Sequence, residues 1–154
     1  MLKLAQIAEE LEIISDVQLC FFDKTSGEVI CVEKTMLGIA EEYEDGDDLQ
    51  LEDWEMAEFR DALQIFRNWG AVLRLPSKYD INEYNIMAEF CQEYPNERIS
   101  DRRCSLIRGS GAFRRFKNAI SAYDIEEQWY THKRQSYVNI ARNWCEDNAI
   151  EFEE

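Results

Sequence analysis

Two short apolar segments near the start of the chain constrain the fold more than any other feature. Residues 17–22 and 28–33 are rich in Val, Ile, Phe and Cys, and the turn-forming residues 23–27 separate them. Such a connector, ending in a glycine that accepts positive φ, is typical of a hairpin of antiparallel strands. A further apolar segment, residues 71–75, is stopped by Pro76. The sequence therefore predicts a small, mainly antiparallel sheet made of an N-terminal hairpin and a third strand.

Most of the remaining chain has apolar residues at helical spacing. The predicted helices cover residues 2–11, 51–69, 80–94 and 96–108, a segment that Ser110 can cap, and a last segment after Asp124. The segment after Ser110 has an apolar stripe of Phe113, Phe116, Ile120 and Tyr123. We expect one capping box at Asp80 with Glu83 and another at Asp124 with Glu127.

The order of these elements indicates the fold class. A helix, a hairpin, a helix, a strand and then several helices do not make the steady alternation of a doubly wound sheet. We therefore expect an α+β fold, with the small sheet packed by helices on one side and a C-terminal half that is mostly α-helical. The sequence has no Ser/Gly linker or low-complexity segment, so residues 1–154 are predicted to form a single domain.

Net charge limits the partners of this chain. It has 154 residues with 32 acids and 17 bases, a formal charge of −15. Residues 1–97 hold 23 acids and 7 bases, whereas residues 98–154 hold 9 acids and 10 bases. The acidic part repels polyanions, so we expect no contact with a membrane and no nonspecific binding to duplex DNA. No apolar run has the length of a membrane span and no signal peptide is visible, which predicts a cytoplasmic protein.

The cysteines predict neither a disulfide framework nor a metal centre. The five are Cys20, Cys31, Cys91, Cys104 and Cys145, at irregular spacing and without a CxxC motif. An odd number without a secretion signal is typical of reduced thiols. Structural zinc sites usually have paired ligands at short spacing, so we expect buried thiols, no metal site and no cofactor.

The most distinctive motif is a basic, glycine-flanked segment at a predicted helix start. Its candidate anion-binding residues are Arg108, Gly109, Ser110, Gly111, Arg114, Arg115 and Lys117. Backbone N–H groups at a helix start are free to donate, and the helix dipole favours an anion there. Arginine and lysine add charge that pairs with phosphate or carboxylate. An RNA backbone, a phosphate ligand or an acidic protein segment would fit this site.

An internal role would use the same residues. The chain has many carboxylates with which these arginines can pair, and the glycines can serve only to make a tight turn between helices. The sequence leaves this choice open, because it does not identify the neighbours of Arg108, Arg114 and Arg115.

The same segment carries a resemblance to a known family. The matching motifs are Gly-Ala-Phe-Arg-Arg-Phe-Lys at residues 111–117, Trp129-Tyr130, Ala-Arg-Asn-Trp at 141–144, Phe22-Asp23 with Ser-Gly-Glu-Val at 26–29, Leu-Pro-Ser at 75–77 and Met-Ala-Glu-Phe at 87–90. Together they resemble a bacterial uncharacterised protein family, the one numbered 0158, over most of the chain except residues 35–60. The resemblance implies a bacterial, cytosolic protein and transfers no catalytic residue.

Other polar motifs favour structure over chemistry. Asp23 follows an apolar strand, as a phosphate-transferring aspartate would, but its place in a hairpin connector predicts a turn. The acidic residues 41–48 do not match an EF-hand loop and are expected to form a solvated surface or a docking patch. His132, the single histidine, stands in a polar stretch that is predicted to be an exposed linker. The sequence has no Walker loop or dinucleotide fingerprint, and it predicts no catalytic residue.

We therefore expect a non-enzymatic binding or regulatory protein that engages an anionic partner through residues 108–117. One alternative is a metal-dependent hydrolase or phosphate-handling enzyme that combines this anion site with carboxylates from residues 41–53. Another is a structural or stoichiometric partner whose many aromatic residues form an oligomer interface. The sequence does not determine the oligomeric state.

Overall fold

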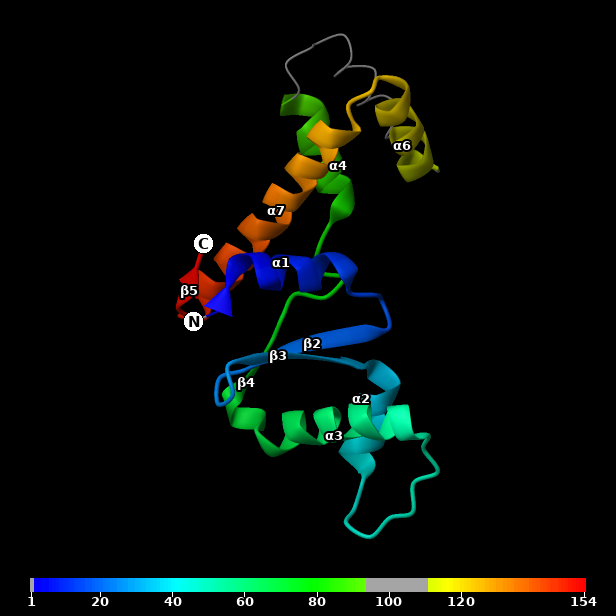
Figure 1. The fold of residues 1–154 in the computed structure, drawn as a ribbon, viewed down its shortest axis with the longest axis vertical. Helices are drawn as coiled ribbons and strands as arrows, with labels where there is room; N and C mark the ends of the chain where they lie inside the picture. The colour runs from blue at the N-terminus through cyan, green and yellow to red at the C-terminus, as the bar shows by residue number, and fades with distance from the viewer. Residues whose placement is uncertain (1, 94–110) are drawn as a thin grey trace.

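A three-stranded antiparallel sheet separates two layers of helices in the computed structural model, which describes residues 2–93 and 111–154. Its strands are β2 (Gln18–Asp23), β3 (Glu28–Glu33) and β4 (Val72–Arg74), in the order β3-β2-β4. The predicted hairpin and third strand are thus confirmed. A second, parallel pair joins β1 (Leu2–Lys3) to β5 (Phe152–Glu153) and brings the two ends of the chain together (Figure 1).

Helices cover both faces of this sheet. One face packs against α1 (Leu4–Ile13) and the C-terminal part of α7 (Glu126–Asp147), and the other packs against α2 (Lys34–Glu42) and α3 (Asp53–Arg67) (Figure 1). The expectation of helices on one side was wrong, and no helix was predicted over α2. Phe22 packs with the first layer and its neighbour Phe21 with the second. A strand with consecutive apolar residues has two apolar faces, and each needs a cover.

Away from the sheet, the molecule continues through α4 (Glu83–Glu93) and the N-terminal part of α7 to α6 (Ala112–Ala122), which lies at the far end (Figure 1). The fold is α+β. The helix predicted over residues 96–108 lies outside the described residues. Within the described ranges, no helix is both long enough and apolar enough to cross a bilayer.

The start of α4 differs from the predicted capping box. Asn82 caps this helix, because its Oδ1 accepts a hydrogen bond from the N–H of Asn85 at 3.2 Å. Asp80 instead accepts from the N–H and the hydroxyl of Ser77, at 2.8 and 3.0 Å. These hydrogen bonds from Ser77 hold the pKa of Asp80 below its usual value. The predicted pairing of Asp80 with Glu83 was therefore wrong.

The second predicted capping box is also wrong. Helix α7 has Ile125 at its N-cap, and no side chain accepts a hydrogen bond there. Asp124 lies in the preceding turn. Its φ of 55° is left-handed, whereas an N-cap residue typically has an extended backbone. A capping box does form at α3, where Glu52 and Glu55 bond reciprocally to backbone N–H groups.

Candidate functional site

Helix α6 differs in charge from every other helix that the structure describes. It carries Arg114, Arg115 and Lys117 and has no Asp or Glu, in a chain whose formal charge is −15. The other described α-helices each contain acidic residues. Three of the four cations of residues 108–117 therefore lie on one described helix.

Three side chains of α6 form an exposed basic and aromatic surface, which we call the α6 face: Phe113, Arg114 and Lys117. They are neighbours on the helix because they lie three and four positions apart or adjacent. Phe113 is 47% exposed, although its spacing predicted a place on the buried stripe. Neither Arg114 nor Lys117 forms an ion pair with any carboxylate in the described ranges. The α6 face is thus open to a partner.

The start of α6 brings the Arg115 guanidinium close to Gly111. Gly111 is the N-cap of α6 and has a φ of 77°, which a residue with a Cβ rarely adopts. A Cβ built at Gly111 would also lie 3.3 Å from a guanidinium nitrogen of Arg115. Arg115 is half-buried and already interacts within the protein. Of the predicted anion-binding residues, Arg108, Gly109 and Ser110 lie outside the described residues.

An aromatic cluster attaches α6 to the rest of the molecule. Phe116 is buried on the opposite side of α6 from the exposed cations, and its ring centroid lies 4.8 Å from that of Trp129 on α7. Phe90 of α4 contacts both rings, at 6.2 Å from Phe116 and 5.5 Å from Trp129. The rings pack edge to face, the arrangement that aromatic quadrupoles favour. The orientation of the α6 face therefore depends on this three-ring contact.

His132 belongs to the same cluster, so the prediction of an exposed linker was wrong. It lies within α7, half-buried, with its ring centroid 5.4 Å from that of Phe90. Its Nε2 lies 3.1 Å from the carbonyl oxygen of Ile86, and its Nδ1 lies 3.9 Å from a carboxylate oxygen of Glu93. The polar residues around His132 lie on the solvent side of α7, and the sequence near His132 did not indicate this.

A cleft of about 740 Å³ opens beside His132, between α4 and α7. Phe90 and His132 contribute its apolar part, and the acids Glu93 and Glu127 stand at its rim. The acids among its lining residues give it a charge opposite to that of the α6 face. None of its described lining residues pairs a nucleophile with an activating base.

Asp23, the last residue of β2 before the hairpin turn, is a fully buried carboxylate with 0% of its surface exposed. Its oxygens accept from the backbone N–H of Thr25 at 2.8 Å, from Nε2 of Gln64 at 3.0 Å and from Nδ2 of Asn68 at 3.2 Å. The hydrogen bond from Gln64 is the main reason that the pKa of Asp23 lies below its usual value, and burial opposes it only in part. The predicted turn is confirmed for residues 24–27, and the Asp23 carboxylate also fixes the C-terminal end of α3 to the sheet.

A second buried polar contact joins α7 to α4. The hydroxyl of Tyr137, a fully buried residue, donates to Oε1 of Glu83 at 2.6 Å. Lys78 and Lys133 lie 3.4 and 3.8 Å from the same oxygen. Burial alone would raise the pKa of Glu83, but the hydrogen bond from Tyr137 and the two cations hold this pKa below its usual value. Burial and the Glu83 charge raise the pKa of Tyr137, which stays protonated as the donor.

Replacing Tyr137 with phenylalanine is expected to lower the free energy of unfolding by about 2 kcal/mol. The substitution removes the hydroxyl that donates to the charged Glu83 carboxylate, but it keeps the ring and so leaves no large cavity. Tyr84→Phe on α4 is a matched control, since Tyr84 is exposed and forms no side-chain hydrogen bond within the described residues. Urea unfolding of both variants measures the difference. Equal costs for the two variants would contradict the role of the Tyr137 hydroxyl.

The carboxylates of residues 41–53 do not converge on a common point. Asp47 accepts from the N–H of Glu44 at 2.9 Å, and Glu52 and Glu55 cap α3. Among the described residues, the single group of three or more His, Cys, Asp or Glu that could hold a metal ion lies elsewhere. The arrangement therefore gives no support to a hydrolase that would take its metal ligands from residues 41–53.

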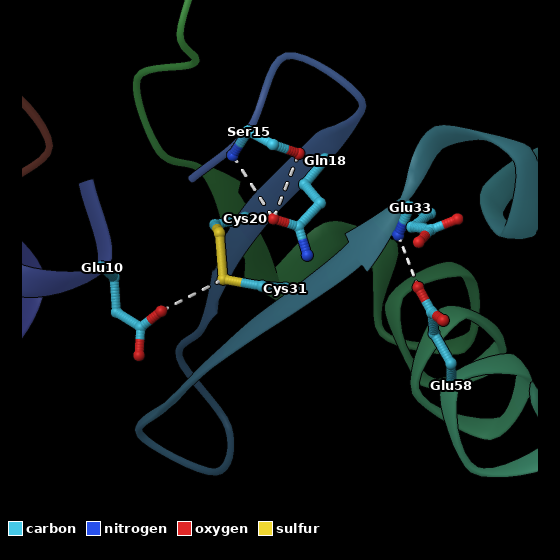
Figure 2. Close-up of a disulfide and its surroundings, with 7 residues drawn as sticks. All are labelled: Glu10, Ser15, Gln18, Cys20, Cys31, Glu33 and Glu58. Carbon is cyan, nitrogen blue, oxygen red and sulfur yellow. Dashed lines mark hydrogen bonds between the residues drawn. A yellow bond between two sulfur atoms is a disulfide. The ribbon is translucent and has the colours of Figure 1, made fainter. Parts of the chain in front are cut away.

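That group consists of Glu10, Cys20 and Cys31, which sequence reasoning did not bring together. Cys20 and Cys31 are direct partners across the hairpin and form a disulfide (Figure 2). The expectation of reduced thiols was therefore wrong for this pair, whereas Cys91 and Cys145 are buried thiols as expected, and Cys104 lies outside the described residues. The register of the hairpin was the signal that could have identified the pair, because it decides which residues face each other.

Comparisons of this chain with protein-family models, with curated proteins and with solved structures found no match.

Proposed function

We propose that this protein is a non-enzymatic binding or regulatory protein that engages an anionic partner through the α6 face. The observation that carries the proposal is the exposure of Phe113, Arg114 and Lys117 on an acid-free helix of an otherwise acidic chain. Cations without an internal carboxylate partner are available to pair with phosphate or carboxylate groups of a ligand.

Charge separation along the molecule supports this proposal. The exposed acidic loop that follows α2 and the α6 helix lie at opposite ends of the molecule (Figure 1). Such a distribution orients an approaching anion toward α6, while the total charge of −15 repels long polyanions. The proposal therefore favours a short or locally anionic partner and disfavours nonspecific binding to duplex DNA.

Phe113 adds an apolar component to the charged contact. An exposed ring beside two cations offers stacking to an unpaired base or packing to an apolar residue of an acidic peptide. Both kinds of partner present negative charge next to an apolar group, which is the combination that the α6 face complements. A cytoplasmic location and a relation to the uncharacterised family 0158 are part of this proposal.

Reversing two charges of the α6 face tests the proposal directly. Arg114→Glu with Lys117→Glu is expected to weaken binding at least about tenfold, because each lost pair involves charged groups. The probes are a fluorescent single-stranded RNA and a fluorescent Glu-rich peptide that contains an aromatic residue, measured by anisotropy over a range of salt concentrations. Wild-type binding to one probe that weakens as salt rises is the expected result.

The matched control carries the same charge change on α3, as Arg60→Glu with Arg67→Glu. Both residues are exposed, and their helix covers the face of the sheet opposite to the one that α1 and α7 cover. The control is expected to bind like the wild type after a small correction for net charge. Equal losses in the two double variants, or no binding of either probe by the wild type, would contradict the assignment to α6.

A further inference from the structure

The Cys20–Cys31 pair lies on the face of the sheet that α1 covers. Cys20 is in the centre of β2, Cys31 is opposite it in β3, and their Cα atoms are 4.0 Å apart. Cys20 is 2% exposed and Cys31 is partly exposed, and both pack in the cluster that contains α1 and α7. Both sulfur atoms therefore point toward the same helix.

Glu10 of α1 contacts this pair from the side of the sheet that α1 covers. Its Oε2 lies 3.6 Å from Sγ of Cys31 (Figure 2). In a disulfide neither sulfur carries a hydrogen atom, so the contact supplies Glu10 with no hydrogen-bond donor. The described residues offer this partly buried carboxylate no cation and no other donor. A cation held beside the two sulfur atoms would supply this carboxylate with the charged partner that it lacks among the described residues.

We propose that Glu10, Cys20 and Cys31 form a binding site for a thiophilic divalent cation, Zn²⁺, when the two cysteines are reduced. One carboxylate oxygen and the two sulfur atoms lie within 4.8 Å of one another, from two strands and a helix. Two thiolates and a carboxylate are a ligand set that Zn²⁺ accepts, at about 2.3 Å for sulfur and about 2.0 Å for oxygen. Sulfur ligands disfavour Ca²⁺ and Mg²⁺, which bind oxygen.

Reduction opens the site by thiol–disulfide exchange. A dithiol reductant donates two electrons and two protons, so that Cys20 and Cys31 become thiols and the reductant becomes a disulfide. As the cation binds, the two thiols release their protons to solvent, and both sulfurs coordinate as thiolates. A water completes the tetrahedral shell, because Cys31 and Glu10 are partly exposed and leave a path to solvent.

The disulfide and the metal are therefore alternative cross-links of the same three elements. The disulfide joins β2 to β3, whereas the cation would join both strands to α1. Metal binding to the folded, reduced protein would also raise its midpoint of thermal unfolding, and the increase would grow with the logarithm of the free metal concentration. This site is separate from the α6 face, and its failure would leave the proposed anion-binding function unchanged.

The test is a titration of the full-length protein, reduced with a phosphine under anaerobic conditions and freed of metal, with Co²⁺ and then Zn²⁺. Thiolate ligation of Co²⁺ produces sulfur-to-metal charge-transfer absorption, and Zn²⁺ should abolish it by displacement. The oxidised protein should show no such absorption. Absence of the absorption from the reduced wild type, or its presence in the oxidised protein, would overturn the proposal.

Variants then assign the ligands. Cys31→Ser should remove the charge-transfer absorption, and Glu10→Gln should weaken Co²⁺ binding about 10- to 100-fold or more, the range seen when even supporting groups of metal sites are lost. The matched controls are Cys145→Ser, at a free thiol of α7, and Glu9→Gln, at an exposed acid next to Glu10.

Both controls should bind like the wild type, and circular dichroism verifies that each variant is folded. If Cys31→Ser does not fold, the comparison of Glu10→Gln with Glu9→Gln decides the matter. Equal affinity of these two variants for Co²⁺ would overturn the three-ligand site.

Discussion

Replacing Trp129 with alanine is expected to lower the free energy of unfolding by about 4 kcal/mol, which is typical for removal of a buried aromatic ring. Trp129 is 7% exposed and packs against Phe90 and Phe116, with ring centroids 5.5 and 4.8 Å away. Its loss would leave a cavity at the point where α4, α6 and α7 meet, because none of these helices can collapse into the space without losing its own contacts. Chemical denaturation measures the cost.

The consequence for binding distinguishes this ring from an ordinary core residue. The α6 face keeps its cations in Trp129→Ala, but α6 loses the ring contact between Phe116 and Trp129 that joins it to α7. Affinity for the anionic probe should therefore fall even under conditions in which the variant remains folded. Trp54→Ala serves as control, since Trp54 is 69% exposed and its removal is expected to change stability by less than about 0.5 kcal/mol. A similar cost for the two variants would contradict the described packing.

Replacing Asp23 with alanine is expected to cost about 3 kcal/mol, because three donors lose a buried charged acceptor. Those donors are the backbone N–H of Thr25 and the side-chain amides of Gln64 and Asn68. They link the hairpin turn to the end of α3, so the loss affects both. Asp16→Ala, at an exposed acid ahead of β2, is the control and is expected to lie within about 0.5 kcal/mol of the wild type.

The contribution of Asp23 should also depend on pH in a defined direction. Because the pKa of this carboxylate is lowered in the folded state, its stabilising effect is present above the usual aspartate value of 3.8 and is lost as pH falls through the folded-state pKa. The stability difference between wild type and Asp23→Ala should therefore be constant near neutral pH and shrink below about pH 4. A difference that grows on acidification would contradict the hydrogen-bonded, charged state of Asp23.

The hairpin shows both the reach and the limit of sequence reasoning. Turn residues between two apolar segments predict the hairpin. The predicted connector, residues 23–27, is one residue longer than the observed connector, because Asp23 belongs to β2 and pairs with Glu28. A shift of one residue moves every side chain to the opposite face. The pairing of Cys20 with Cys31 depends on that single position, and so does the metal site inferred from it.

The candidate binding site was predictable only in part. The concentration of positive charge around residues 114–117 follows from the amino-acid sequence alone, and these residues lie on α6. Which cations face solvent depends on tertiary contacts, and these engage Arg115 while leaving Arg114 and Lys117 without a carboxylate partner in the described ranges. Phe113 has a place on the apolar stripe that predicted burial, but the rings of α4 and α7 pack against Phe116, and Phe113 stays exposed.

Position in the fold also explains why His132 was misread. Its neighbours in sequence are polar, but helical geometry turns its ring toward Phe90 and Trp129 while the adjacent cations remain nearer solvent. A run of polar residues in a sequence is found both in linkers and on the outer face of helices. The two are hard to distinguish when the inner face of the helix has few apolar residues.

The most direct test of the central claim is a nuclear magnetic resonance titration of the isotope-labelled full-length protein with the probe that binds. The account predicts that the largest changes in amide chemical shift fall on residues 112–122 and that Arg114→Glu with Lys117→Glu removes them, while amides of α3 stay unchanged. Changes centred on the acidic loop after α2, on α3 or on the cleft beside His132 would contradict the assignment of binding to the α6 face.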